Sequence, residues 1–500
     1  MATLVHDELI LIASAFLECL QIENELILTS LKYMDLRCSS SITSSPDVSG
    51  IPYLEYLNLS KCDSMVEVHQ SVMLHERIIH LDLSSCSSLR ILPHSIQMKS
   101  LQMLNLYACE SLGRFPEISM ETRRLLVLEM DRCQGIRGLP SSFRLLTSLT
   151  ILTVGQDHNE EFDYSRGVYK RCLQVLTHLR SLRVLDLREN NFVEEDFPMD
   201  LQNAWPCLEE LNLYGNLMTR LPASISHLSH LKYLNLRKCE NLKELPELPE
   251  FIQVLKADGC GSLQKIGDIS NKYNWLFQIS FKNCGMLLQD QETQIFLDNM
   301  LMKSFVHKCA AMNHRLSIAV PGRKIPNWFT NKCLGNTITM ELDQSQITKM
   351  TGLAICCIIA PFSGTYKFPK LFIKFKPSSS GKLIDLPPRG AEGSHVWIGY
   401  MSTDILGNIP HGFEPNGLIL EFHEFCSIME CGVCVIHKDD TKSLTGTGSW
   451  IPDYDDMEMV DRFSASGKGL PNGRWSCPTF SIEHETTGHI GKVEVSGLNF

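Results

Sequence analysis

The sequence lacks any apolar run long enough to cross a membrane. The apolar stretch Leu9 to Leu17 has about half of the residues that a membrane-spanning helix needs. The residues before it include Asp7 and Glu8 but no Lys or Arg, so a signal peptide is not predicted either. Basic residues are also the minority, because 46 Lys and Arg stand against 57 Asp and Glu for a net charge of -11. We therefore expect neither membrane insertion nor general binding to nucleic acid.

Motifs of catalysis and nucleotide binding are missing too. The sequence has no G-x-x-x-x-G-K-[ST] phosphate loop, no strand-borne G-x-G-x-x-G and no G-x-S-x-G nucleophile elbow. Its His and Asp residues show no spacing that pairs an acid with a base. We predict a protein that is not an enzyme and that holds no cofactor.

Two groups of residues come near to metal-binding motifs without matching them. The first lies in and before a predicted strand and comprises His423, Cys426, Cys431, Cys434 and His437. On a strand, side chains three residues apart point to opposite faces, so Cys431 and Cys434 would not share an ion. The second group comprises His484, Glu485 and His489. Its two His residues are spaced one residue too far apart to lie on one face of a helix. No metal site is predicted in either group.

What the sequence does contain is an internal repeat. The template L-x-x-L-x-L-x-x-C-x-x-L-x-x-L-P fits residues 78–93 and recurs along the chain. Repeat starts lie at Leu31, Leu54, Ile78, Leu101, Leu125, Leu149, Leu182, Leu208, Leu231, Ile252 and Leu276. Their steps of 23, 24, 23, 24, 24, 33, 26, 23, 21 and 24 residues lie within or near the roughly 20 to 29 residues of leucine-rich repeats. The longest step contains the polar run Gln156 to Glu161, which predicts a projecting loop.

Each repeat alternates apolar and polar residues over a short strand. The leucines are expected to point inward, and the residues between them to lie exposed on the concave surface. Their mixture of aromatic, amide and charged groups suits a protein partner better than a phosphate backbone. The predicted partner-binding residues are Tyr56, Asn58, Lys61, Asn105, Tyr107, Glu129, Asp131, Arg132, Asp186, Arg188, Glu210, Asn212, Tyr214, Tyr233, Asn235 and Arg237.

The chain has 19 cysteines, an odd and scattered number unlike the dense framework of a small secreted scaffold. Seven share one repeat position, where Asn190 and Asn216 stand in two other repeats: Cys62, Cys86, Cys109, Cys133, Cys239, Cys260 and Cys284. That position is expected to be buried and to need a small side chain that satisfies nearby backbone groups. Free thiols favour a reducing compartment, the cytoplasm or the nucleus.

The repeats are predicted to span residues 31–288. Because solenoid ends are normally capped, either structure upstream completes the fold or residues 1–30 form an irregular or helical cap, with Asp7 to Leu28 as its helix. A connector at residues 289–311 leads to a domain at residues 312–440, and residues 441–500 are predicted to be a flexible tail. Short strands predict an antiparallel sandwich, and they are Leu316 to Val320, Thr337 to Leu342, Gly352 to Ala360, Leu371 to Phe375, His395 to Tyr400, Leu418 to Phe425 and Cys431 to His437.

Two features resemble one protein family. The cysteine-containing repeats are similar to those of plant intracellular immune receptors, the Toll-like (TIR) nucleotide-binding leucine-rich-repeat proteins. After them, Pro321 to Phe329 (PGRKIPNWF) resembles the family's post-repeat motif P-G-x-x-I-P-x-W-F. His395 to Tyr400 and Cys431 to Val433 resemble strands of its C-terminal domain. The implied fold class is an α/β leucine-rich-repeat solenoid (horseshoe) followed by an all-β jelly-roll/Ig-like sandwich.

In that family the repeats and the sandwich recognise pathogen effectors, whereas upstream domains bind nucleotide and cleave NAD. The resemblance implies a plant innate-immunity protein that binds a pathogen effector or a host guardee protein, with a full-length immune receptor as a partner in trans. Sandwich loops such as Asp343 to Lys349 and Gly407 to Asn416 would contribute. One alternative is an extracellular leucine-rich-repeat receptor fragment. Secreted plant repeats usually carry many N-x-[ST] sequons, and the single one here, at Asn58, argues against this alternative. The other is an adaptor or scaffold protein.

Overall fold

The computed structural model describes residues 2–5, 8–12, 30–156, 173–266, 275–289, 306–307, 309–310, 316–360, 370–376, 382–385, 394–403, 417–423 and 428–441. The predicted tail from residue 442 onward, the projecting loop after Gln156 and most of the connector lie outside these residues. So do Cys426, His484, Glu485 and His489 of the two near-metal groups.

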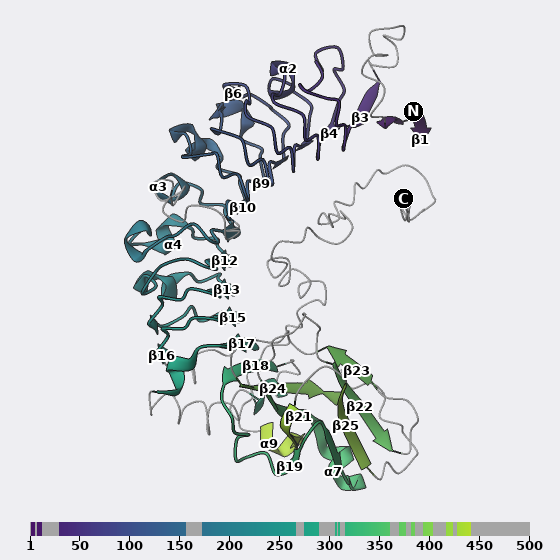
Figure 1. Cartoon of the computed structure of the whole chain (residues 1–500), viewed down its shortest axis with the longest axis vertical. Coiled ribbons are helices and arrows are strands. Elements are labelled where there is room, and N and C mark those ends of the chain that lie inside the picture. The colour runs from purple at the N-terminus through teal and green to yellow at the C-terminus, as the bar shows by residue number, and fades with distance from the viewer. Residues whose placement is uncertain are drawn as a thin grey trace. The chain divides into compact units, whose positions relative to one another are not determined.

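The repeats form one parallel ladder of short strands (Figure 1). Every predicted repeat start is followed within two residues by a strand, so the predicted repeat period is confirmed. Neighbouring strands pair in register, and Leu57 lies opposite Leu81, which lies opposite Leu104. The strands are β3 (Leu31–Asp35), β4 (Tyr56–Asn58), β5 (His80–Asp82), β7 (Met103–Asn105), β9 (Val127–Glu129), β10 (Ile151–Thr153), β11 (Val184–Asp186), β12 (Glu210–Asn212), β13 (Tyr233–Asn235), β15 (Val254–Lys256) and β17 (Gln278–Ser280).

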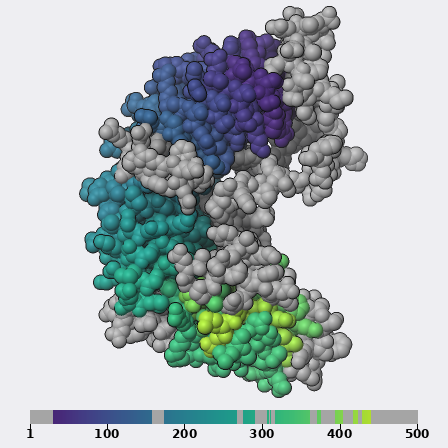
Figure 2. Space-filling view, viewed as in Figure 1, coloured from purple at the N-terminus to yellow at the C-terminus, as the bar shows by residue number. Residues whose placement is uncertain are grey.

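The leucines of successive repeats make a continuous core. Leu81, Leu104 and Leu128 are fully buried, and they belong to a single cluster that runs along the whole ladder. Figure 2 shows the described repeats, from purple to teal, packed against one another. Each repeat therefore buries its apolar face mainly against its neighbours.

On the other side of the repeats, the described residues form short turns of helix and two short pairs of strands. The repeats thus contain less helix than the expected α/β class implies. The residues that follow the strand and its turn form i→i+3 hydrogen bonds, such as Phe143 N–H to Pro140 O at 3.0 Å. The helical turns are α2 (Gln70–Met73), η1 (Met120–Thr122), η2 (Ser141–Leu145), α3 (Leu173–Leu176), η3 (Glu194–Asp196), α4 (Leu201–Ala204), η4 (Ala223–His227) and η5 (Gly285–Leu288). Two short parallel pairs join them: β6 (Ser95–Ile96) with β8 (Glu117–Ile118), and β14 (Glu244–Leu245) with β16 (Lys265–Ile266).

The column of cysteines has the role expected of it. Each thiol is buried and donates to a carbonyl of the preceding repeat, as Cys86 Sγ does to Leu59 O at 3.1 Å. In two other repeats an amide makes the same bond: Asn216 Nδ2 donates to Leu187 O at 3.0 Å. Burial raises the pKa of Cys86 to about 12, so the thiol stays protonated and keeps its donor.

The N-terminal residues that the structure describes form strands, not the irregular or helical cap that was expected. β1 (Ala2–Val5) pairs antiparallel with β2 (Glu8–Ile12), and β2 pairs parallel with β3. The physical reason is the open edge of β3, whose backbone groups need partners that an apolar Leu and Ile segment can supply as a strand. The cap over the first repeat is thus a continuation of the sheet.

The C-terminal domain consists of two antiparallel sheets, green to yellow in Figure 1. One has the order β18 (Leu316–Pro321), β24 (His395–Ser402), β21 (Met350–Ile359), β26 (Ile428–His437) and β19 (Asn331–Leu334). The other has the order β20 (Thr337–Met340), β25 (Gly417–His423), β22 (Lys370–Lys376) and β23 (Lys382–Asp385). The short helices α7 (Gln344–Lys349) and α9 (Lys438–Thr441) flank β21 and β26.

All seven strands predicted for this domain are present, and β19 and β23 are additional. Side chains of both sheets, including Ile355, Trp397 and Phe422, share one apolar cluster, so the sheets pack face to face. Cys431 belongs to that cluster whereas Cys434 packs against the other side of its sheet, which confirms that the two thiols point to opposite faces. The jelly-roll or Ig-like topology stays a prediction.

The far side of the larger sheet is buried as well. β17 of the last repeat pairs in parallel with β18, with Ile279 opposite Ile318, so the repeat ladder runs directly into this sheet. The post-repeat motif packs here: Ile325 and Phe329 are buried, and Trp328 stacks on Phe329 with ring centroids 3.9 Å apart. Burial on both faces explains why β21 and β24 are almost continuously apolar in sequence.

Candidate partner-binding surface

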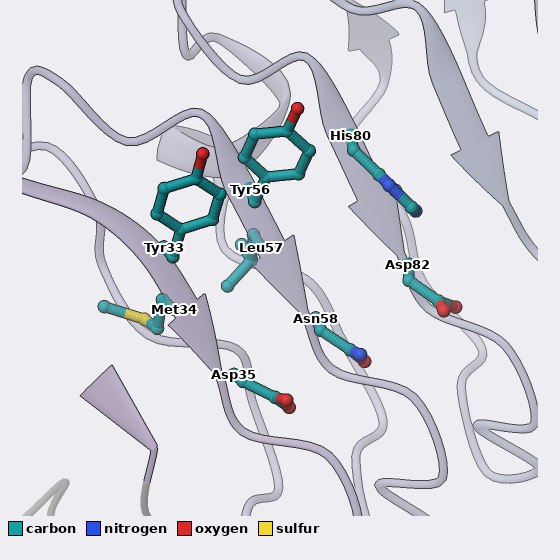
Figure 3. Close-up of a pocket in the computed structure, with 8 residues that line it drawn as sticks. All are labelled: Tyr33, Met34, Asp35, Tyr56, Leu57, Asn58, His80 and Asp82. Carbon is teal, nitrogen blue, oxygen red and sulfur yellow. The ribbon is translucent and has the colours of Figure 1, made fainter. Parts of the chain in front are cut away.

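The candidate surface is the face of the ladder formed by the first and third residues of each strand, called here the strand face. The middle residue of each strand, such as Leu57, points into the core. First positions such as Tyr56 and third positions such as Asn58 point to the opposite face (Figure 3). Alternation within three-residue strands therefore places the predicted partner-binding residues on one surface.

The third position of the strand is occupied mostly by Asp or Asn, and we call this column the Asx row. Asn58 Oδ1 accepts the backbone N–H of Ser60 at 2.9 Å, and Asp82 Oδ1 accepts that of Ser84 at 2.8 Å. The bond supports a turn whose next residue has positive φ, as at Lys61 (59°). The Asx row is therefore part of how each repeat turns out of its strand.

This role corrects the expectation that all of the predicted residues are exposed. The side chains that satisfy the turns or pack against neighbouring strands are less than a tenth exposed, and they are Asn105, Asp131, Asp186, Asn212, Tyr233 and Asn235. Burial follows because a side chain that caps the backbone must lie against it. The residues that remain half-buried or exposed are Tyr56, Asn58, Lys61, Tyr107, Glu129, Arg132, Arg188, Glu210, Tyr214 and Arg237.

In the middle of the strand face one guanidinium holds two buried carboxylates. Arg188 Nη2 lies 3.1 Å from Asp131 Oδ2, and its Nη1 lies 3.0 Å from Asp186 Oδ2. The side chain passes over Gly155, where an added Cβ would lie only 2.5 Å from Arg188 Cγ. Gly155 N–H also donates to Asp131 Oδ1 at 2.6 Å. Arg188 thus joins repeats on either side of the long insertion.

Burial raises the pKa of both Asp131 and Asp186, and the Arg188 charge opposes that rise. Glu129, which replaces Asp or Asn in the Asx row, has its pKa raised to about 8 by burial and then by the neighbouring Asp131 and Asp82. The middle of the strand face therefore carries more acidic than basic groups, and Glu129 binds a proton near neutral pH.

Toward the C-terminal end the strand face becomes basic and aromatic. Arg237 and Lys238 each lie 5.8 Å from the ring centre of Tyr214, and Lys256 Nζ lies 5.5 Å from that of Tyr233. These are cation–π distances. The surface thus offers acidic groups in its middle repeats and cationic groups in its last ones.

The first repeats form a hollow of about 250 Å³ (Figure 3). Its lining comprises Tyr33, Met34, Asp35, Tyr56, Leu57, Asn58, His80 and Asp82, and we call it the tyrosine hollow. Two parallel columns of side chains meet in it, one aromatic and one from the Asx row. Sequence reasoning identified only two of these residues, although the recurrence of Tyr, Tyr and His at the same strand position was readable from the repeat period.

The aromatic column is ordered by stacking. The rings of Tyr33 and Tyr56 are 4.7 Å apart and nearly parallel at 11°, and His80 is tilted at 6.0 Å from Tyr56. Burial lowers the pKa of His80, so this imidazole is neutral near pH 7. The in-register pairing of β3, β4 and β5 sets the spacing of the column.

Metal binding gains no support from this geometry. Within the described residues, no group of three or more His, Cys, Asp or Glu side chains is arranged to hold a metal ion. None of the described helices has the length and apolar character to span a bilayer.

Parts of the chain are similar to known proteins. Residues 320–442 match the C-JID domain family. A stretch of 54 residues is 43% identical to TMV resistance protein N of Nicotiana glutinosa, and covers 11% of this chain and 5% of that protein. A stretch of 50 residues is 50% identical to Disease resistance protein RPP4 of Arabidopsis thaliana, and covers 10% and 4%. A solved leucine-rich-repeat protein of Leptospira interrogans aligns over 48% of this chain and 80% of its own, with 18% identity and a TM-score of 0.22.

The fold and these matches define the class, a leucine-rich-repeat protein that continues into a C-JID domain. Within that class, the chain is similar to the C-terminal region of plant TIR-type nucleotide-binding leucine-rich-repeat proteins, which confirms the resemblance inferred from the sequence. The matched stretches span only 5% and 4% of the two relatives. Both relatives are named as resistance proteins.

Proposed function

We propose that this protein recognises another protein during plant disease resistance, and that it binds through the strand face together with the C-terminal domain. Its partner would be a pathogen effector or a host guardee protein in the cytoplasm or nucleus, with a full-length immune receptor acting in trans. Its role would be recognition without catalysis.

The observation that carries the proposal is the composition of the strand face after the structural residues are set aside. Tyr56, Tyr107 and Tyr214 remain accessible beside charged residues of both signs, such as Glu210 and Arg237. Tyrosine and arginine are enriched in protein interfaces, whereas a phosphate-binding face would be uniformly basic. The C-JID match supports the contribution of the C-terminal domain.

Of the two loops expected to contribute, one is described. Asp343 is the N-cap of α7. Its carboxylate accepts Gln346 N–H at 2.7 Å, and the Gln346 side-chain oxygen accepts Asp343 N–H at 3.0 Å. This capping box makes the 343–349 segment a preformed element. Gly407 to Asn416 lies outside the described residues.

The extracellular alternative is not favoured by the position of its sequon. Asn58 lies half-buried in the Asx row between Asp35 and Asp82, and its Oδ1 is used by Ser60 N–H. A glycan on Asn58 would cover the tyrosine hollow. We therefore keep protein recognition inside the cell as the proposal.

The test is co-precipitation of the tagged full chain with a panel of candidate effectors and guardees co-expressed in leaf tissue. The strand-face variants are Glu210→Lys and Arg237→Glu, and Glu250→Lys on an exposed turn is the matched control. We expect both strand-face variants to capture less partner while melting at the unchanged temperature, and the control to behave as wild type. A captured partner that binds both variants equally well would refute the placement on the strand face.

A further inference from the structure

Asp82 is a buried carboxyl group without a matching cation. Its residue is 8% exposed, and one oxygen accepts Ser84 N–H at 2.8 Å. Among the residues that the structure describes, no Lys, Arg or His nitrogen lies within ion-pair distance of its carboxylate. A buried carboxylate is costly unless a charge balances it. The side chain reaches into the tyrosine hollow, where a ligand could supply that charge (Figure 3).

The neighbours of Asp82 do not supply the charge. Burial lowers the pKa of His80 more than the nearby Asp82 charge raises it, so this imidazole is neutral near pH 7. Asp35, at the other end of the hollow, already accepts Arg37 Nε at 2.8 Å. That pair shows that the Asx row accommodates a guanidinium, but Arg37 extends to solvent with a side chain 62% exposed. The carboxylate of Asp82 is thus the group in the hollow that needs a partner.

The walls of the hollow suit a flat cation. The stacked rings of Tyr33 and Tyr56, 4.7 Å apart, present aromatic surface beside the Asx row. A cation over such a face is attracted by the ring quadrupole. A guanidinium has the further advantage of a planar group that stacks on an aromatic ring and pairs with a carboxylate at the same time.

The hollow is smaller than most sites for small molecules. Sites for small molecules and cofactors usually have about 300–1,000 Å³, and the tyrosine hollow has about 250 Å³. The volume is on the scale of one long side chain. With a net charge of -11, the chain also attracts basic partners at long range.

We propose that the tyrosine hollow is a subsite for one basic side chain of the protein partner, an arginine in preference to a lysine, whose guanidinium stacks beside Tyr56 and pairs with Asp82. The inference deepens the proposed function, on which it rests, by naming the chemistry of the partner at this point. It predicts that partners present an exposed arginine in an extended or loop segment.

The test uses the full chain and a synthetic peptide of repeated Gly-Ser-Arg triplets, with a counterpart in which citrulline replaces every arginine. Citrulline keeps the shape of the side chain and removes its charge. Binding is measured by calorimetry for the wild type and for Asp82→Asn, Tyr56→Leu and Glu250→Gln. Asn already stands in the Asx row at Asn58 and Asn105, so Asp82→Asn keeps the acceptor for Ser84 N–H. Glu250→Gln removes one charge from an exposed turn and is the control.

We expect the arginine peptide to bind, and Asp82→Asn to weaken it at least about tenfold, because a desolvated charge pair is lost. Tyr56→Leu should weaken it about threefold or more, and Glu250→Gln should leave it unchanged. Equal binding of the citrulline peptide would overturn the inference. So would an affinity for Asp82→Asn within about twofold of wild type, or an equal loss in Glu250→Gln.

The two proposals fail in different ways. If the peptide binds through Asp82 but co-precipitation finds no partner that depends on the strand face, the subsite stands and the proposed function fails. If a captured partner binds Asp82→Asn as well as wild type, and the peptide does not discriminate either, recognition stands and the arginine subsite is wrong. Thermal melts of each variant check that it is folded.

Discussion

Arg188 offers a direct measurement of what the middle of the strand face contributes to stability. Its guanidinium is the cation of Asp131, at 3.1 Å, and of Asp186, at 3.0 Å. The Asp186 side chain is fully buried and that of Asp131 is 11% exposed, so neither can be solvated if the guanidinium is removed. We choose Arg188→Met, which keeps the aliphatic stem over Gly155 and removes the charge.

The expected cost is about 3 kcal/mol. Breaking a buried pair by removing one partner costs about 3–5 kcal/mol, and the lower end applies because the Arg188 side chain is itself 24% exposed. For repeats that unfold as one unit this corresponds to a fall in melting temperature on the order of 10 °C. Urea unfolding followed by circular dichroism gives the free energy, and hydrogen exchange of β10 and β11 locates the loss.

The pH dependence distinguishes charge from packing. Without Arg188, burial raises the pKa of Asp131 and Asp186 further, and a carboxyl whose folded pKa is raised stabilises at low pH and loses that stability as pH rises. The cost of Arg188→Met should therefore be smaller at pH 5 than at pH 8. Adding Asp131→Asn and Asp186→Asn should recover most of it. A cost that is the same at both pH values, or no loss of stability at all, would contradict the proposed role of the guanidinium.

Three further outcomes follow from the structure. Asn216→Ala should cost about 2–4 kcal/mol in urea unfolding because it removes five hydrogen bonds, whereas Asn216→Cys should cost about half as much, since a thiol keeps the bond to Leu187 O; equal costs would contradict the equivalence of Cys and Asn. Glu129 has a folded pKa of about 8 against an ordinary 4.5, so stability is lost between these values as pH rises, and Glu129→Gln should stabilise by about 2–4 kcal/mol above pH 8 and by nothing near pH 4. Gly352→Ala should lower the melting temperature, because its Cβ would lie 2.2 Å from Met401 O, and an unchanged melt would show that β21 and β24 are not so closely packed.

The period of the sequence predicts much of this fold. The spacing of leucines sets every strand of the ladder, since a strand residue between two leucines must point away from the core. The strands of the C-terminal domain were equally readable, because burial on both faces makes β21 and β24 apolar over most of their length. β19 was not readable, since its residues from Asn331 to Leu334 are largely exposed and carry no alternation.

The candidate surface was less predictable, because period two gives the face of a residue but not its depth. Asn105 and Tyr107 lie on the same face, yet Asn105 is 1% exposed because it caps the turn that leads to Tyr107. The partnership of Arg188 with Asp131 was hidden for another reason. Arg188 and Asp131 lie two repeats apart, and the guanidinium reaches the carboxylate only because Gly155, in the repeat between them, has no side chain. The repeat template does not show this, because it marks Gly155 only as a position that differs from the other repeats.

The pairing of β17 with β18 has a consequence for how the protein can be divided. A parallel ladder ends in a strand with unpaired N–H and C=O groups, and such an edge recruits other chains. Here Phe277 O receives Ser317 N–H at 2.9 Å, and Phe281 N–H donates to Ala319 O at 2.7 Å, so the C-terminal domain closes that edge. A chain cut before Leu316 would carry complete repeats and still expose an adhesive strand. The repeats and the C-terminal domain are thus separate in sequence pattern but continuous in the sheet. For that reason they are better expressed together as one polypeptide.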